Sequence, residues 1–206
     1  MNPEKISTEN KWLQFGGFSP LITIFKAFHP LNEEIEKIIN DETFPVVFKK
    51  NKFISSPLHK NKYIFLILEG TVRGFMKHGN KEITTWISKE NELVGTIRNL
   101  WEDEATEEYI QAIEPILAIA IPHTMSKELY EKFPIANYVG RKMTEMYYAQ
   151  AFERGYLIRL QSAERRYKRF LKSYPALIDR VPLKFIASFL GMRLETLSRI
   201  RAKINA

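Results

Sequence analysis

The sequence predicts an α+β fold in which an antiparallel β-roll or barrel precedes a long helix and a helical C-terminal region. Between residues 44 and 121, short runs rich in Ile, Val, Phe, Tyr and Thr alternate with turn-forming residues, which is typical of antiparallel strands. After Pro122 the spacing of the apolar residues becomes helical. We therefore expect three parts, covering residues 1–134, 135–160 and 161–206.

A short amphipathic helix is expected over residues 31–42, before the strands. Its apolar residues at helical spacing are Leu31, Ile35, Ile38 and Ile39. The strand-like runs follow at residues 44–54, 63–77, 81–87 and 109–122. Gly79 and Asn80 separate two of these runs and predict a hairpin turn.

Two helices are expected next, a connecting one over residues 123–133 and a long one over residues 135–160. The apolar residues of the long helix recur about every 3.5 residues, which is the period of a coiled-coil seam. They are Val139, Met143, Met146, Ala149, Phe152, Tyr156 and Leu160. Such a stripe could also pack on the chain's own strand region, but its narrowness favours a seam between two copies of the chain.

The C-terminal region is predicted to begin with a capped helix and to continue into a pair of short helices. Ser162 can cap a helix that stops before Pro175, and Pro182 suits the first turn of the next helix. In residues 183–203, which follow Pro182, the small side chain of Ala187 permits two helices to cross closely, and Gly191 can adopt the positive φ of a sharp turn between them.

The second helix of this pair is expected to pack on the first through its apolar side chains. Leu197 and Ile200 lie at the spacing that this contact requires. Two short helices joined by a glycine turn form the helix-turn-helix pattern.

The remaining side chains of the second helix form a polar face that suits DNA. Arginine pairs with guanine O6 and N7, glutamate accepts from cytosine N4, and small hydroxyl groups bind phosphates or either base edge. The candidate base-reading residues are Arg193, Glu195 and Arg199, and the candidate backbone contacts are Thr196, Ser198, Lys184 and Lys203. The alternative is a simple i, i+4 ion pair between Glu195 and Arg199.

The distribution of charge indicates an anionic partner for the same region. Residues 141–206 hold 15 Lys and Arg against five Asp and Glu, whereas residues 1–140 hold 16 against 19, so the net charge of +7 comes from the last third. Further candidates for phosphate contacts are Arg165, Arg166, Lys168 and Arg169. A solvated basic surface without a partner is the alternative.

Composition weighs against several other classes of site. The chain contains no cysteine, which removes thiolate metal sites and cysteine nucleophiles and suits a cytoplasmic location. No apolar run reaches the roughly 20 residues that span a bilayer, so no membrane partner is expected. The four histidines are scattered, and neither a Ser-His-Asp spacing nor a phosphate-cradling glycine loop stands out. We do not expect an enzyme.

The order of these elements resembles the Crp/Fnr family of bacterial transcription regulators, from residue 20 onward. The likeness is strongest in PLKFIASFLGMRLETLSRIRAKI, and a turn of the roll that is similar to the family's GxVRxF appears as GTVR at residues 70–73. It implies a cyclic-nucleotide-binding-like β-roll as the sensor or effector domain, then a dimerisation helix, then a DNA-binding domain. Glu195 and Arg199 match the family's base readers, and Thr196 matches a threonine that contacts the DNA backbone. The implied partners are a roughly palindromic double-stranded operator, a second copy of the chain and RNA polymerase.

The segment LVGTIRNLWEDEATEEYIQA departs from the family's cyclic-AMP cassette, in which a glutamate binds the ribose hydroxyl and an arginine neutralises the phosphate. Gly95 is kept, but Thr96 replaces the glutamate, and Thr106 followed by Glu107 stands where the arginine belongs. Arg98 is a nearby cation, but nothing in the spacing requires it to enter the pocket. We expect cyclic AMP not to bind in the usual way, and the pocket to be either empty or adapted to an unknown effector.

Other cofactors of the family find no clear ligands in this sequence. Iron–sulfur sensing needs cysteines, and the candidate axial haem ligands are isolated histidines, so no cofactor is identified. The sequence ends just after the second helix, as in a wingless subgroup of Bacteroidetes-type regulators. Leu194 stands where some members carry an arginine, and we expect a different target sequence.

Two functions remain open from the sequence. The first is a homodimeric, sequence-specific transcription regulator. The alternative is an effector-binding or protein-interaction module that does not bind DNA.

Overall fold

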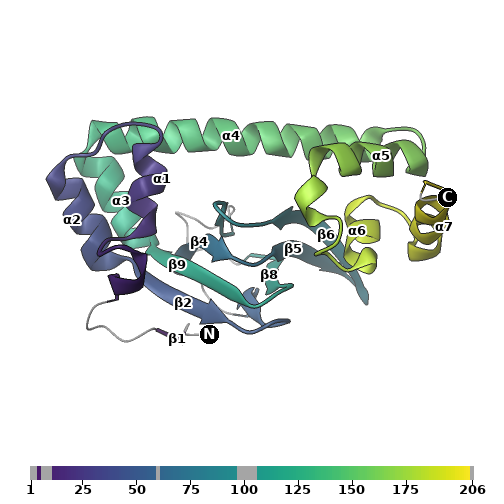
Figure 1. The fold of residues 1–206 in the computed structure, drawn as a ribbon, viewed down its shortest axis with the longest axis horizontal. Helices are drawn as coiled ribbons and strands as arrows, with labels where there is room; N and C mark the ends of the chain where they lie inside the picture. The colour runs from purple at the N-terminus through teal and green to yellow at the C-terminus, as the bar shows by residue number, and fades with distance from the viewer. Residues whose placement is uncertain (1–3, 6–10, 59–60, 97–105, 205–206) are drawn as a thin grey trace.

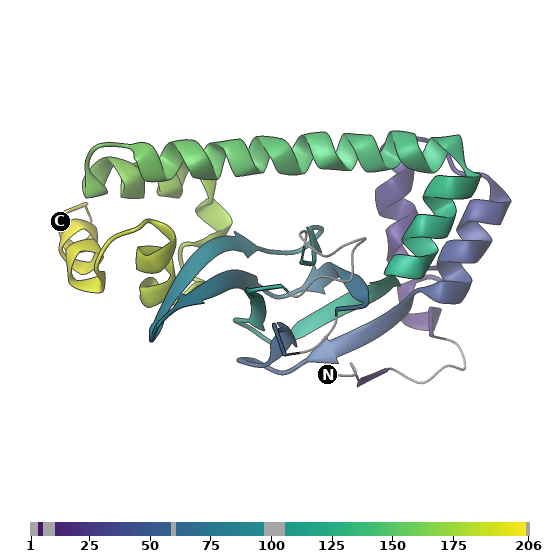
Figure 2. The same cartoon turned by 180° about the vertical axis from the view of Figure 1, so that it is seen from behind.

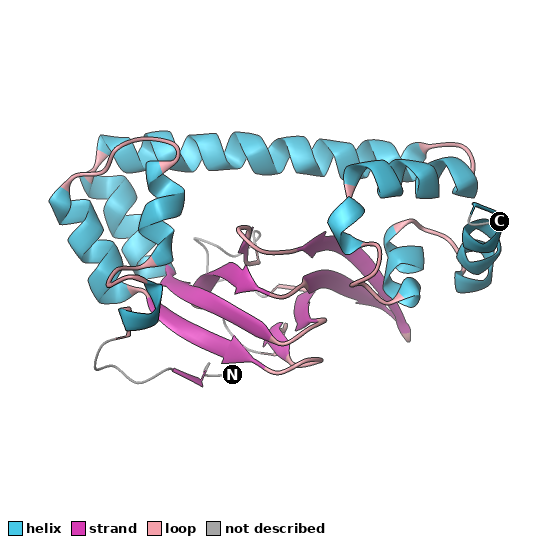
Figure 3. Cartoon of the chain, in the orientation of Figure 1, coloured by secondary structure: helices cyan, strands magenta, loops and turns pink. Residues whose placement is uncertain are grey.

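The computed structural model, which describes residues 4–5, 11–58, 61–96 and 106–204, consists of two antiparallel sheets with helices at both ends (Figures 1 and 3). One sheet has the strand order β1-β2-β9-β4-β7 and the other has the order β3-β8-β5-β6. The strands are β1 Glu4–Lys5, β2 Phe44–Phe48, β3 Phe53–Ser55, β4 Tyr63–Glu69, β5 Val72–His78, β6 Lys81–Ser88, β7 Leu93–Val94, β8 Glu108–Ala112 and β9 Ile116–Pro122. This arrangement confirms the predicted α+β fold with its antiparallel roll.

The helices lie in two groups, joined by one long helix. They are η1 Leu13–Phe15, α1 Pro20–Lys26, α2 Glu33–Glu42, α3 His123–Lys132, α4 Pro134–Arg159, α5 Ala163–Ser173, η3 Pro175–Leu177, α6 Leu183–Phe189 and α7 Leu194–Ile204. Helices α1 to α3 pack at one end of the roll and α5 to α7 lie at the other, with α4 running between the groups (Figures 1 and 2). The helices expected over residues 31–42, 123–133 and 135–160 correspond to α2, α3 and α4.

The central strands of the first sheet are apolar on both faces because both faces are covered. In β4, Phe65 and Ile67 face the second sheet, whereas Leu66 packs among the N-terminal helices. In β9, Ala118 likewise faces the second sheet, and Ile119 packs among the N-terminal helices. A strand that is buried on both faces reads as a nearly continuous apolar run, which explains the sequences YIFLIL and ILAIAI.

The hairpin between β5 and β6 turns where the sequence predicts it. His78 pairs with Lys81, and Gly79 between them has a φ of 57°. Further along the hairpin, Gly74 pairs with Trp86, and the indole Nε1 of Trp86 donates a hydrogen bond of 2.7 Å to Glu108 on β8. The indole ring therefore lies over the backbone of Gly74 and fills the space where a side chain would be.

We predict that Gly74→Ala lowers the free energy of unfolding by about 1–3 kcal/mol, because its Cβ would overlap the Trp86 ring. Urea unfolding of the two proteins measures the difference. The control is Gly95→Ala, whose Cβ would meet Ile64 at an ordinary 3.5 Å. Equal stability of Gly74→Ala and the wild type would contradict the prediction.

Candidate nucleic-acid interface

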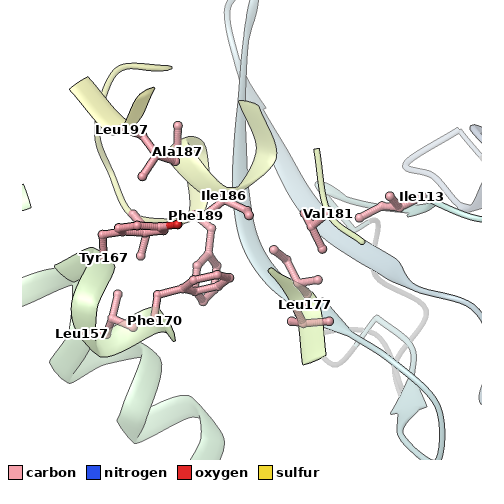
Figure 4. Close-up of a cluster of buried hydrophobic side chains, with 12 residues drawn as sticks. Ile113, Leu157, Tyr167, Phe170, Leu177, Val181, Ile186, Ala187, Phe189 and Leu197 are labelled. Atoms are coloured by element: carbon pink, nitrogen blue, oxygen red, sulfur yellow. The ribbon is translucent and has the colours of Figure 1, made fainter. Parts of the chain in front are cut away.

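The C-terminal helices form a compact unit around one apolar cluster (Figure 4). Tyr167 and Phe170 of α5 pack against Ala187 of α6 and Leu197 of α7, and all four side chains are buried. Leu157, near the end of α4, is fully buried in the same cluster. The α5 helix begins at Ser162, whose side chain accepts a hydrogen bond from the backbone of Arg165, as the sequence predicts.

The turn between α6 and α7 has the geometry that the glycine predicts. Gly191 adopts a left-handed conformation with a φ of 61°, which costs little without a Cβ. The backbone NH of Gly191 donates to the carbonyl of Ser188, and that of Met192 donates to Ala187. These bonds end α6 after about two turns. At the other end of the helix, Pro182 is the N-cap, one residue before the first helical position. The helix-turn-helix is therefore present.

Two of the predicted base-reading residues, Glu195 and Arg199, lie on the outer face of α7, and the third, Arg193, immediately precedes the helix. Arg193, Glu195 and Arg199 are exposed, as are Ser198 and Lys203, whereas Thr196 is half-buried. In the described part of the chain, Glu195 forms no ion pair with Arg199, which instead donates weakly to the Glu195 carbonyl at 3.4 Å. The carboxylate and guanidinium are therefore separately available to a ligand.

Several cations counted as phosphate contacts are bound within the protein instead. Arg169 forms a bidentate pair with Glu153 of α4, at 2.6 and 2.7 Å, and this pair lowers the pKa of Glu153. Lys168 lies 2.7 Å from Glu164 on the same helix. Arg166 reaches the carbonyl of Gly191 at 3.5 Å and so braces the turn. Lys184 on α6 is exposed, and its ammonium lies 4.8 Å from the centre of the Phe185 ring.

The apolar stripe of α4 divides into a buried part and an exposed part. Val139 and Met143 are buried by other parts of the same chain, so their side chains are not accessible to a second copy at the expected seam. The exposed part consists of Met146, Ala149, Phe152 and Tyr156. Gly140 lies against the Tyr130 ring of α3, where a Cβ would come within 2.6 Å of the hydroxyl. Close packing on the chain's own helix therefore explains this glycine.

The segment aligned with the cyclic-AMP cassette is described only at its ends. Thr96 is buried, and its hydroxyl accepts a hydrogen bond from Asn61 at 3.2 Å. Thr106 is also buried and accepts from the backbone of Glu108, whereas Glu107 is exposed. Gly95 is half-buried beside Ile64. Arg98 lies outside the described residues.

The C-terminal unit also contacts the roll through residues that the sequence did not single out. Arg180, between η3 and α6, forms ion pairs of 2.6 Å with both Glu90 and Glu114, which lie in two turns of the roll. Glu90 also accepts a hydrogen bond from the backbone of Gly70 in a third turn. These pairs raise the pKa of Arg180 and lower the pKa of both glutamates, that of Glu90 to about 2.

Comparison of the whole structure with solved structures defines the class of fold. A crystal structure described as a Crp/Fnr-family transcriptional regulator from Eubacterium rectale matches with a TM-score of 0.72 and 17% identity, over 89% of this chain and 88% of that one. FixK2 from Bradyrhizobium japonicum matches with a TM-score of 0.68 and 16% identity, over 79% and 84%. The global regulator CLP from Xanthomonas campestris, described as responsive to c-di-GMP, matches with a TM-score of 0.63 and 14% identity, over 84% and 92%.

The protein thus has a fold built from a β-roll, a long helix and a helix-turn-helix. That fold is the one found in Crp/Fnr-family transcription regulators. No family model and no curated protein sequence matches this chain. Within the described residues, no helix has the length and apolarity needed to cross a membrane. Nor does any group of three or more His, Asp or Glu side chains in that part of the chain suit a metal ion.

The stability of the protein is predicted to fall on acidification through the ion pairs of Arg180. The pKa of Glu90 is about 2 in the folded state against an ordinary value of 4.5. Its contribution is therefore present above pH 4.5 and is lost as the pH falls toward 2. Denaturant unfolding at a series of pH values should show a shallower acid loss for Glu90→Gln than for the wild type. Identical slopes would contradict a stabilising role for the pair.

Proposed function

We propose that this chain is a sequence-specific, DNA-binding transcription regulator of the Crp/Fnr type. The observation that carries the proposal is the exposed polar surface at the start of α7. Arg193, which immediately precedes the helix, and Glu195 and Arg199 on the helix are free of ion pairs among the described residues. The first turn of a recognition helix is the part that contacts base edges in the major groove. Ser198, Lys203 and Lys184 are exposed and are the proposed phosphate contacts, although Lys203 also lies 3.8 Å from Glu164 of α5. RNA polymerase is a further partner of the proposed regulator.

The proposed active form is a homodimer joined along α4. Phe152 is 69% exposed and Tyr156 is 49% exposed, and together with Met146 and Ala149 they form an apolar strip on one face. An apolar strip of this kind on a long helix favours burial against a matching surface. Two copies joined there would present two α7 helices to successive major grooves, about 34 Å apart, on a roughly palindromic site.

The roll is proposed to act without the usual cyclic-AMP chemistry. Arg73, the described arginine of the roll, stacks on Phe185 of α6 and is not directed into the interior. Among the described residues, Phe65 is buried in the apolar cluster between the sheets, and the half-buried rings of Phe44 and Tyr63 pack against this cluster. Any effector would be of another class, and we propose no cofactor.

We predict that Arg199→Ala relaxes the preference at one base pair of each half-site, at a cost of about 1–3 kcal/mol per contact. Selection from random duplexes with the purified protein gives the preferred site, and fluorescence anisotropy at a fixed salt concentration gives the affinities. Arg201→Ala is the matched control, because Arg201 lies 3.6 Å from Asp179 on the side of α7 away from the reading face. Unchanged discrimination in Arg199→Ala would remove this residue as a reader.

The same selection separates the two functions that the sequence leaves open. A failure of the wild type to enrich any sequence would favour the effector-binding or interaction module that does not bind DNA.

We predict that Phe152→Glu converts the dimer to a monomer, because it would place a carboxylate in the apolar contact. Native mass spectrometry reports the oligomeric state. Leu13→Glu is the control, since it also introduces a carboxylate at an exposed apolar position, in η1 and outside α4. A dimeric Phe152→Glu variant would contradict the proposed contact.

A further inference from the structure

Helix α6 is attached to the roll as well as to its own partner helices. It lies against β6, the edge strand of the second sheet (Figures 1 and 2). The hydroxyl of Ser188 accepts a hydrogen bond of 3.0 Å from the backbone NH of Thr84 and donates one of 3.1 Å to the carbonyl of Glu82. An edge strand has unpaired backbone groups, and here a side chain of the helix-turn-helix pairs two of them.

A buried arginine forms the second contact between the two units. The guanidinium of Arg73 lies 3.7 Å from the ring centre of Phe185 on α6 and 4.1 Å from that of Phe75 in the roll. It also donates to Gln111 at 2.9 and 2.7 Å and pairs with Glu82. Only 2% of Arg73 is exposed, so the stacked cation is desolvated and its orientation is fixed on both sides.

The third contact combines the ion pairs of Arg180 with apolar burial. Arg180 donates two hydrogen bonds to Glu90 and two to Glu114, at distances from 2.6 to 3.2 Å. Beside it, Ile113 of the roll belongs to the same buried cluster as Val181 and Ile186 (Figure 4). Ile87 of the roll is a further member of this cluster. Paired hydrogen bonds between an arginine and a carboxylate fix the relative orientation of the two groups as well as attracting them. This contact therefore opposes rotation of the C-terminal unit relative to the roll.

The contacts with the roll hold α6, whereas α7 packs on α5 and α6 and leaves its reading face exposed. The unit is also joined to α4 by the chain itself and by the pair between Arg169 and Glu153. It is therefore held at two separate places, the end of α4 and the outer face of the roll. A unit held only at the end of α4 would be able to swing about that turn.

We propose that Arg180, Ser188 and Arg73 are positioning residues that fix the helix-turn-helix on the roll, so that the dimer accepts two half-sites at one separation only. This inference rests on the proposed function. In this inference, the contact between the roll and α6 helps to select operators by the spacing of their half-sites. The three side chains act without touching DNA.

The test uses the full-length protein and duplexes that carry the selected half-sites at a series of centre-to-centre separations around 10 bp. The wild type is expected to prefer one separation. The variant Arg180→Gln with Ser188→Ala should bind the best duplex about tenfold more weakly and discriminate little between separations, since a loosened unit loses preorganisation. Its preference for the bases within each half-site should remain, and its thermal unfolding should remain cooperative.

Two further variants separate positioning from charge and from loss of folding. Glu90→Gln with Glu114→Gln makes the protein more positive, so a purely electrostatic effect would tighten binding to DNA. Positioning instead requires weaker binding to the best duplex and a flatter dependence on separation. The matched control is Arg165→Gln, which removes an exposed cation of the same unit that forms no ion pair or side-chain hydrogen bond with the described residues of the roll. It should weaken binding at every separation by the same factor.

The outcomes distinguish this inference from the function on which it rests. A wild type that selects no sequence would overturn the proposed function. A wild type that selects a site, with both double variants keeping its spacing preference, would overturn the positioning role and leave the function standing. If a double variant loses its base preference within the half-site, its helix-turn-helix is damaged and its spacing profile does not test the positioning role. The single variant Ser188→Ala then provides the test, because it removes only the two hydrogen bonds of the Ser188 hydroxyl. An unchanged spacing profile in that variant also overturns the inference.

Discussion

The structure depends on covering both outer faces of a two-sheet roll. The inner faces of the sheets bury one another, but each sheet also has an apolar or aromatic outer face that must be removed from water. The N-terminal helices and α3 cover the outer face of the first sheet, where Leu66 and Ile119 are fully buried. Helix α6 covers part of the second sheet, around Arg73. The placement of the candidate DNA-reading helix follows from this second contact.

The sequence predicted the features that depend on neighbouring residues. Gly79 marked the hairpin, Ser162 marked the start of α5, and Gly191 marked the turn between α6 and α7. Each of these residues acts within one turn of chain, through a backbone conformation or a single capping bond. The exposed face of α7 was predictable for the same reason, because the period of a short helix decides which side chains its partner can bury.

Contacts between distant parts of the chain were not predictable from the pattern. Arg180 and Glu90 are 90 residues apart, and nothing in either neighbourhood indicates the other. Counting the charges of the last third treated Arg169 and Arg180 as free cations, although both are paired with glutamates. The heptad spacing of α4 similarly could not show that Val139 and Met143 are buried by their own chain.

The apolar cluster in Figure 4 has a consequence for the order in which the protein folds. Its members Ile87 and Ile113 precede Ile186 by 70 residues or more, so the cluster closes only after long loops of chain have been drawn together. During synthesis the roll emerges first and can present these two side chains as a template. The C-terminal helices then complete their core on a surface that already exists. A roll that folds slowly would therefore delay the formation of the helix-turn-helix, whatever the helical propensity of α6 and α7.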